Sequence, residues 1–205
     1  MYRFDILNHF ISKYNFKNYL EIGVFYGECI EAVNILHKDG VDPGNEGVVH
    51  PKVNYPITSD EFFKLIKDHP EILYDIVFID GLHHSVQVIK DITNSLKHSV
   101  KEGVIAMHDC NPPTKAHAQV PRNGRRDWNG DTYKAFLQSR IDNPQHKHFV
   151  VDDDWGVGVI LKNQGDFNID KNELQQGIDS WEYFNTNRTK LLTLISPDEF
   201  KESYK

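Results

Sequence analysis

The sequence predicts an α/β fold with a Rossmann-like, doubly wound sheet that is mostly parallel and has an antiparallel closing strand. Short apolar runs typical of buried parallel strands, of which 75–80 is the clearest, alternate with segments that carry apolar residues at helical spacing. Two last strand-like runs, 149–151 and 156–161, follow one another as a closing pair. Strands that alternate with helices and end in adjacent strands are typical of this architecture.

The first half of the chain alternates helices and strands. Residues 3–15 carry apolar side chains at helical spacing and lead into a short buried strand at 19–22. A glycine-containing turn follows, and a helix is predicted over 28–38. Further strands are predicted at 39–43 and 53–57, and Thr58 or Ser59 caps a helix that stops at Pro70.

The second half continues the alternation and then becomes polar. After the strand at 75–80, helices are predicted at 86–100 and 131–140, with a strand at 103–108 and a polar loop at 110–129 between them. A loop of this length inside a compact domain is more often functional than idle. We assign 1–162 to one domain and 163–205, with a helix around 185–195, to a C-terminal extension that packs on the domain or on a partner subunit.

The composition fits a soluble globular protein. The 205 residues include 23 basic and 30 acidic side chains, a net charge of −7, and no long basic run, which argues against a nucleic-acid or anionic-membrane partner. Two cysteines make no disulfide framework and suit a reducing compartment. No run approaches the ~20 apolar residues of a membrane span, and the N-terminus lacks the apolar core of a signal peptide. We therefore expect a cytoplasmic protein and leave a homo-oligomer open.

Polar residues follow four predicted strands at the point where each strand ends. They are Glu21 and Gly23, Asp42, Asp80 and His83, and Asp109. Ligands of doubly wound sheets bind beyond the carboxyl ends of the strands. We therefore expect these four groups to meet at one edge of the sheet and to form the functional site.

The turn Gly23-Val-Phe-Tyr-Gly27 and Asp42 together predict a nucleoside site. Asp42 lies 19 residues after Gly23, and an acid at about this distance accepts both ribose hydroxyls in nucleotide-binding α/β folds. The alternative is that Asp42 only forms a turn. Phe25 and Tyr26 leave little room for a pyrophosphate against the backbone. A nucleoside without phosphates is therefore favoured over NAD.

Asp80, His83 and Asp109 predict acid–base or metal chemistry. Two carboxylates on neighbouring strand ends with a nearby histidine suit an oxygen-preferring cation such as Mg²⁺. A neutral His83 beside them is a candidate general base. The alternative is that Asp80 caps the following helix. Ser59 and Asp60 open a helix and are either plain capping residues or contacts to an adenine ring.

Several motifs in this order resemble class I S-adenosylmethionine-dependent methyltransferases. They are Leu20-Glu-Ile-Gly-Val-Phe-Tyr-Gly, Val41-Asp-Pro, Ser59-Asp-Glu-Phe-Phe, Tyr74-Asp-Ile-Val-Phe-Ile-Asp-Gly-Leu-His and Gly103-Val-Ile-Ala-Met-His-Asp. Within this class the chain looks most similar to metal-dependent small-molecule and sugar O-methyltransferases that carry an Asp-Gly-x-His motif. The resemblance covers roughly residues 15 to 162.

The resemblance implies a role for each matching position. Glu21, Gly23, Phe25, Tyr26 and Gly27 would hold the methionine part of S-adenosyl-L-methionine. The resemblance further implies Asp42 as the ribose ligand and places Ser59 and Asp60 near the adenine. It implies Asp80 and Asp109 as Mg²⁺ ligands and His83 as the general base. Asp80 is also counted among the cofactor-binding and the catalytic residues. The sugar-methylating relatives have a second acid directly after Asp109. Here that position is Cys110, a poor Mg²⁺ ligand, so that either the metal affinity is weaker or another group completes the shell, for which Asp131 is a candidate.

The function implied by the resemblance is methyl transfer to a hydroxyl of a sugar or glycan. Three alternatives stay open: a phenolic or other natural-product acceptor, a metal-dependent hydrolase built on Asp80, His83, His84, His108 and Asp109, and a nucleotide-sensing module without catalysis. The segment from Trp128 to Tyr133 either lines an acceptor pocket or belongs to the core.

Overall fold

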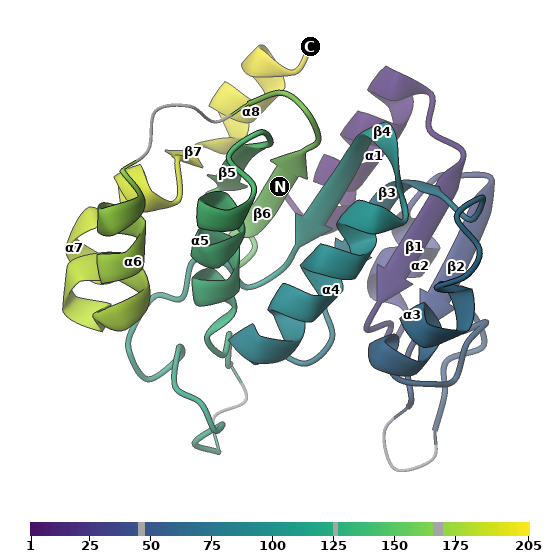
Figure 1. Ribbon diagram of the computed structural model, residues 1–205, viewed down its shortest axis with the longest axis horizontal. Helices are drawn as coiled ribbons and strands as arrows, with labels where there is room; N and C mark the ends of the chain where they lie inside the picture. Colours follow the sequence, from purple (N-terminus) through teal and green to yellow (C-terminus); the bar gives the residue numbers. More distant parts are fainter. Residues whose placement is uncertain (45–47, 125–126, 166–169) are drawn as a thin grey trace.

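A seven-stranded sheet organises the computed structural model, which describes residues 1–44, 48–124, 127–165 and 170–205. The strand order is β2-β1-β3-β4-β6-β5-β7 (Figure 1). The strands are β1 (Asn18–Ile22), β2 (His37–Val41), β3 (Tyr74–Ile79), β4 (Ser99–Met107), β5 (Lys147–Val151), β6 (Val157–Leu161) and β7 (Leu194–Ile195). The pairs β1–β2, β1–β3, β3–β4 and β5–β7 are parallel, whereas β6 runs antiparallel to β4 and β5. The predicted fold class is confirmed.

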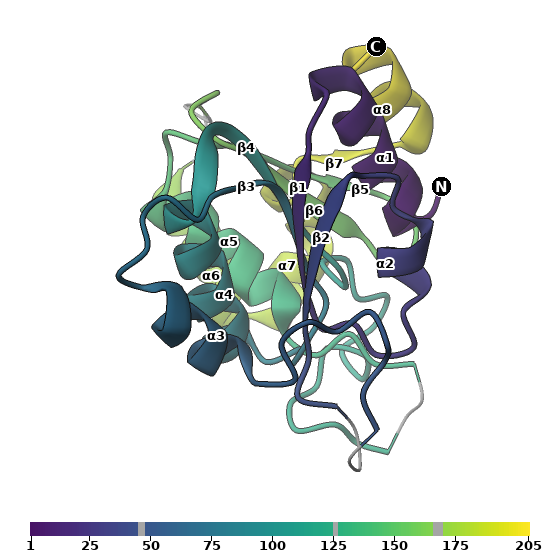
Figure 2. The same ribbon diagram turned by 90° about the vertical axis from the view of Figure 1, so that its right-hand side faces the viewer.

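Helices cover both faces of this sheet (Figure 2). They are α1 (Arg3–Tyr14), α2 (Glu28–Ala32), α3 (Ser59–Ile66), α4 (Ser85–Lys97), α5 (Thr132–Asp142), α6 (Lys171–Asp179), α7 (Trp181–Leu191) and α8 (Pro197–Ser203). One core cluster joins the sheet to α1, α2 and α8, and a second joins the other face to α3–α7. Within the described residues, no helix combines the length and apolarity needed to cross a membrane.

The segment after residue 162 takes part in both layers. It adds β7 to the sheet beside β5. On one face α6 and α7 place Leu174 and Phe184 in the core, and on the other Phe200 of α8 packs against Phe10 of α1 with ring centroids 5.4 Å apart. Packing of this segment against a partner subunit stays a prediction.

The predicted helix over 28–38 is wrong beyond residue 32. Asn8 of α1 terminates α2, because its amide nitrogen donates to the carbonyl of Ala32 at 3.0 Å and its Oδ1 accepts from Asn34 N–H at 2.6 Å. From Val33 the backbone is extended, and residues 37–41 form β2 instead.

The predicted strand at 53–57 is also wrong. This segment forms one isolated bridge, between Tyr55 and Val41. The backbone N–H groups of Asn54 and Tyr55 both donate to the carbonyl of Gly40, and the Asn54 side chain accepts from Gly40 N–H at 2.9 Å. Pro56 has no N–H to continue a ladder. The segment therefore covers the outer edge of β2 without extending the sheet.

Candidate active site

One cavity of about 930 Å³ lies at the carboxyl ends of the parallel strands. Figures 1 and 2 show that the connections following β2 and β4 leave the sheet at this edge. Of the residues predicted from the sequence, the cavity is lined by Gly23, Phe25, Asp42, Ser59, Asp60, Asp80, His83 and Asp109. Of the strand-end residues expected to meet, all except Glu21 therefore line one cavity.

Gly23 allows the ends of β1 and β3 to approach closely. Its φ is +87°, and a Cβ at this position would lie 2.3 Å from the carbonyl oxygen of Asp80. Gly23 N–H donates to Val41 at 2.9 Å, and Asp80 N–H donates to Ile22 at 2.8 Å. Three strand ends are thus joined around a position that only glycine fits.

Asp42 is fixed at the cavity wall by the turn it faces. Its Oδ2 accepts the backbone N–H groups of Val24 and Phe25, each at 2.8 Å, and its Oδ1 accepts Gly44 N–H at 2.7 Å. These bonds attach the end of β2 to the glycine turn. The carboxylate lines the cavity at the position predicted for a ribose contact.

The start of α3 forms the next part of the wall. A capping box between Thr58 and Glu61 begins this helix, so that Ser59 and Asp60 lie at its first turn. Gln87 of α4 donates to Ser59 Oγ at 3.2 Å and to Asp60 Oδ1 at 3.0 Å. Its third acceptor is Asp91 Oδ1 at 3.1 Å. Asp91 lines the cavity too, and burial raises its pKa to about 6.

Three predicted cofactor residues lie outside this lining. Tyr26 is 75% exposed, and a Cβ on Gly27 would meet the ring of His50. Glu21 is buried on the opposite face of β1, where it accepts a hydrogen bond from the hydroxyl of Tyr19. Burial raises the pKa of Glu21 to about 8. Glu21 therefore contacts Tyr19 and the start of α2, at Cys29 and Ile30, and does not line the cavity.

We predict that Glu21→Gln removes part of the pH dependence of stability. Because the folded pKa of about 8 exceeds the unfolded value of about 4.3, the contribution of Glu21 is fully present below about pH 4.3 and is lost as the pH rises through about 8. The glutamine side chain can still accept the hydrogen bond from the Tyr19 hydroxyl, but it does not ionise, so that this pH-dependent loss of stability is absent. Between pH 5 and pH 8.5, the free energy of unfolding should fall in the wild type by on the order of a few kcal/mol more than in the variant. Urea unfolding at both pH values measures this, and identical pH dependence of the two proteins would contradict it.

Asp80, His83 and Asp109 form a compact cluster in the lining of the cavity. His83 Nε2 lies 3.4 Å from Asp80 Oδ1, and His83 Nδ1 lies 3.1 Å from Asp109 Oδ2. One ligand atom from each residue lies within 4.8 Å of the others, which suits a bound cation. Asp109 has a φ of +63°, and the amide of Asn129 donates to its Oδ1 at 2.6 Å.

Three further residues belong to the cluster: Arg3 and Asp154, which the sequence analysis missed, and His108, which it named only for the alternative hydrolase. Arg3 donates to Asp80 Oδ2 at 2.9 Å and to Asp154 Oδ2 at 2.9 Å. His108 Nδ1 lies 3.3 Å from Asp80 Oδ1 and 3.2 Å from Asp109 Oδ2, and its Nε2 lies 3.4 Å from Asp154 Oδ1. Acids and cations therefore alternate throughout the cluster.

The alternation of acidic and basic side chains determines the charge states of Asp80 and His83. Burial opposes ionisation of Asp80, but the charge of His108 and hydrogen bonds from His108 and His83 outweigh it and hold the pKa of Asp80 well below its usual range. Burial also opposes protonation of His83, but the hydrogen bond to Asp80 and the charge of Asp109 outweigh it and raise the pKa of His83. His83 thus favours its protonated form here, whereas a general base must be neutral.

Neither Cys110 nor Asp131 completes the cluster. Cys110 is fully buried and its Sγ lies near the carbonyls of Met107 and His108, at 3.9 and 3.7 Å. Both oxygens of Asp131 accept from Ser85, the backbone N–H at 2.6 Å and the hydroxyl at 2.8 Å. Asp131 therefore fixes the start of α4.

Two tryptophans, Trp128 and Trp155, also line the cavity. The ring of Trp128 stacks on His83 at a centroid distance of 5.4 Å, and its Nε1 donates to the carbonyl of Gln119 at 2.6 Å. Trp155 lies in the connection between β5 and β6, has a φ of +63° and is 43% exposed. Asn111 N–H donates to the Trp155 carbonyl at 2.9 Å and holds this turn against the start of the long loop.

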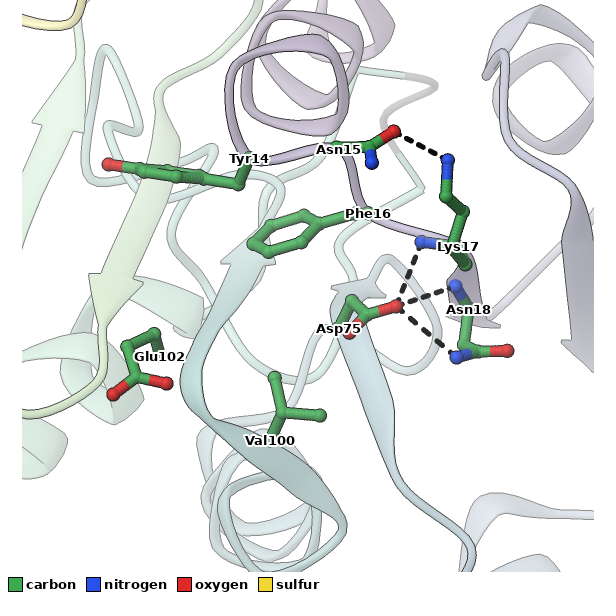
Figure 3. A pocket seen from close by; sticks show the side chains of 8 residues that line it. All are labelled: Tyr14, Asn15, Phe16, Lys17, Asn18, Asp75, Val100 and Glu102. Carbon is green, nitrogen blue, oxygen red and sulfur yellow. Dashed lines mark hydrogen bonds between the residues drawn. The ribbon is translucent and has the colours of Figure 1, made fainter.

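A second cavity of about 430 Å³ lies at the opposite, amino-terminal ends of β1 and β3 (Figure 3). Asp75 Oδ2 accepts the backbone N–H groups of Lys17 and Asn18, each at 2.8 Å, and the side-chain amide of Asn18 at 3.2 Å. These hydrogen bonds hold the two strand starts together. The carboxylate at this cavity thus has a structural role.

Comparisons with known proteins agree with this fold. Residues 20–110 match the family model described as a methyltransferase domain. No curated protein matches the sequence. The O-methyltransferase from Bacillus cereus in complex with SAH is 14% identical, with a TM-score of 0.56 over 78% of this chain and 80% of that chain.

Two further solved structures are similar. The O-methyltransferase TomG from Streptomyces achromogenes, in complex with SAM, is 13% identical, with a TM-score of 0.56 over 77% of this chain and 78% of that chain. The mycinamycin-pathway methyltransferase MycE, in complex with Mg, SAH and mycinamycin VI, is 17% identical, with a TM-score of 0.51 over 79% of this chain and 49% of that chain.

The sheet order and the cavity at its carboxyl edge are those of the class I methyltransferase fold. Residues 20–110, which match the methyltransferase-domain model, include most of β1 and all of β2, β3 and β4 of this sheet, and the chain as a whole has the fold of S-adenosylmethionine-dependent O-methyltransferases. The enzyme class predicted from the sequence is confirmed.

Proposed function

We propose that this chain is an O-methyltransferase that transfers the methyl group of S-adenosylmethionine to a hydroxyl of a sugar or glycan. The observation that carries the proposal is the place of the Asp80–His83–Asp109 cluster within one cavity. Asp80 borders Gly23 of the glycine turn, on the side that we assign to the cofactor, and His83 stacks on Trp128, on the side that we assign to the acceptor. A cofactor on the first side and an acceptor on the second would meet at the cluster.

On the side of the cavity that we assign to the cofactor, each lining residue has a proposed role that agrees with its contacts. Gly23 lets the backbone of the turn pass close to the methionine part. Asp42, held by three backbone N–H groups, presents a carboxylate to the ribose hydroxyls. Ser59 and Asp60, oriented by Gln87, face the adenine.

In the reaction, the sulfonium methyl is already activated, so the protein must orient the acceptor hydroxyl and remove its proton. We assign proton removal to His83, whose ring is held by Asp80, Asp109 and Trp128. A divalent cation such as Mg²⁺ fits the carboxylates of Asp80 and Asp109 and would lower the pKa of an acceptor hydroxyl. Neutralisation of the two carboxylates by a ligand would also favour the neutral form of His83.

The alternative acceptor class is a phenolic or other natural-product hydroxyl. The similar enzyme TomG is described as involved in tomaymycin synthesis, whereas MycE is described in complex with Mg and mycinamycin VI. The polar character of the lining favours a sugar, because Trp155, Asp127 and Arg122 line the same cavity, and the Arg122 guanidinium lies over the Trp128 ring at 5.8 Å from its centroid. Aromatic faces pack on the C–H groups of a sugar ring while polar groups bind its hydroxyls.

We predict that Trp155→Ala raises the acceptor KM by about tenfold or more, because the indole face would be lost. Trp155→Phe keeps a ring at the same position and should raise the KM by less. The affinity for S-adenosylhomocysteine should stay the same in both variants, since we assign Trp155 to the acceptor and not to the cofactor. Initial rates and calorimetry measure the two quantities. An unchanged acceptor KM in Trp155→Ala would remove this residue from the acceptor site.

Two measurements test the proposed function. Calorimetry with S-adenosylhomocysteine should show binding, and its absence would favour the hydrolase built on the same cluster. A panel of sugar and phenol acceptors, assayed for homocysteine product with and without EDTA, then identifies the acceptor class and the cation requirement. Turnover of phenols alone would replace the sugar acceptor by the alternative class. Tight cofactor binding without turnover of any acceptor would favour a sensing module.

A further inference from the structure

Arg3, the first residue of α1, brings the N-terminal helix into the active site. Its side chain lines the cavity although it lies 77 residues from Asp80 and 151 residues from Asp154. Its backbone N–H and Nε donate to Asp154 Oδ2 at 2.8 and 2.9 Å, and Nη2 donates to Asp154 Oδ1 at 3.2 Å. The planar guanidinium is therefore fixed in one orientation.

The remaining hydrogen bond of this guanidinium gives the two carboxylate oxygens of Asp80 different partners. Nη1 of Arg3 donates to Asp80 Oδ2 at 2.9 Å. Asp80 Oδ1 faces the other way, toward His83 Nε2 at 3.4 Å and His108 Nδ1 at 3.3 Å. With Oδ2 occupied, only Oδ1 is turned toward Asp109 and the reaction centre.

Arg3 also places a permanent positive charge beside the two carboxylates that would bind a cation. The guanidinium contacts Asp80 directly, in a part of the cavity where the side chains of Arg3 and Asp80 are only 24% and 16% exposed. A divalent cation between Asp80 and Asp109 would be repelled by this charge across a few ångströms. Such a repulsion is poorly screened away from bulk water.

We propose that Arg3 is a positioning residue that turns Asp80 Oδ1 toward the reaction centre and keeps the affinity of the Asp80–His83–Asp109 site for divalent cations low. This inference rests on the proposed function, because it assigns the control of the cation site in that reaction. It extends the active site to a helix outside the motifs from which the site was predicted.

The test compares Mn²⁺ binding by Arg3→Gln, Arg3→Lys and the wild type, with S-adenosylhomocysteine present, by electron paramagnetic resonance. Arg3→Gln removes the charge and should bind Mn²⁺ at least about tenfold more tightly. Arg3→Lys keeps the charge and should stay within about threefold of the wild type. Lys13→Gln is the matched control, since it removes one charge from the same helix at about 15 Å along its axis and should change nothing.

Unchanged Mn²⁺ affinity in Arg3→Gln would overturn the inference, and so would an equal gain in Lys13→Gln or no Mn²⁺ binding by any of the four proteins. Thermal unfolding verifies that the variants fold. If Arg3→Gln does not fold, Arg3→Lys decides, and a tenfold tighter Mn²⁺ affinity in that variant would contradict the role of the charge. Binding of S-adenosylhomocysteine to the wild type, measured separately, reports on the proposed function and is independent of the Arg3 comparison.

Discussion

Replacing His83 with alanine is expected to lower kcat by about 10²–10⁴-fold while S-adenosylhomocysteine affinity stays within about threefold of the wild type. The ring of His83 is placed by Asp80, Asp109 and the stacked ring of Trp128, and this placement is lost on truncation. The glycine turn and Asp42 do not depend on it. Initial rates and calorimetry on the same preparation measure the two effects.

His84→Ala is the matched control for His83→Ala. His84 precedes α4 and contacts the edge of Trp128, so its truncation should leave kcat nearly unchanged. The pH profile gives a second check. Since a base must be neutral and the pKa of His83 is raised, the wild-type rate should increase with pH along a limb centred above the usual histidine value of about 6.5. Turnover of His83→Ala at the wild-type rate would exclude His83 as the base.

The strand-end residues could be predicted because their placement depends on local sequence and on one topological rule. The apolar run at 75–80 identifies β3, and a parallel neighbour ends at the same edge. Asp80 and Asp109 must then lie close together whatever the details of packing. The same alternation of side chains along β1 points Glu21 to the face of Tyr19, which the motif resemblance did not take into account.

The rest of the site depends on contacts that no local pattern encodes. Arg3 reaches Asp154 across 151 residues, and the position of both follows from how α1 packs on the sheet. Asp154 and Trp155 have positive φ values of +46° and +63°, which are uncommon for residues other than glycine. The only sequence signal for this turn is its run of acids before Trp155 and Gly156. The helix predicted over 28–38 extended into β2 for a related reason. The side chain of Asn8, which lies in α1, ends α2.

The second large effect is expected for Gly23→Ala, which should destabilise the fold by at least about 3 kcal/mol and abolish binding of S-adenosylhomocysteine. The backbone at Gly23 has a φ of +87°, and an added Cβ would lie 2.3 Å from the Asp80 carbonyl oxygen and 2.4 Å from Gly81 Cα. Both obstacles are backbone atoms of the two residues that directly follow β3. Relief of the clash must therefore separate β1 from β3 at the point where the cavity forms.

Gly124→Ala separates the clash from the cost of the backbone conformation. Gly124 has a similar φ of +81°, but among the described residues no atom lies within 4 Å of its added Cβ. This control should lose only about 1 kcal/mol, the cost of a left-handed conformation for alanine. Urea unfolding of both variants gives the difference, which is the contribution of the close approach between Gly23 and Asp80. Equal losses in the two variants would show that the strand ends can move apart freely, and Gly23 would then be needed for its φ alone.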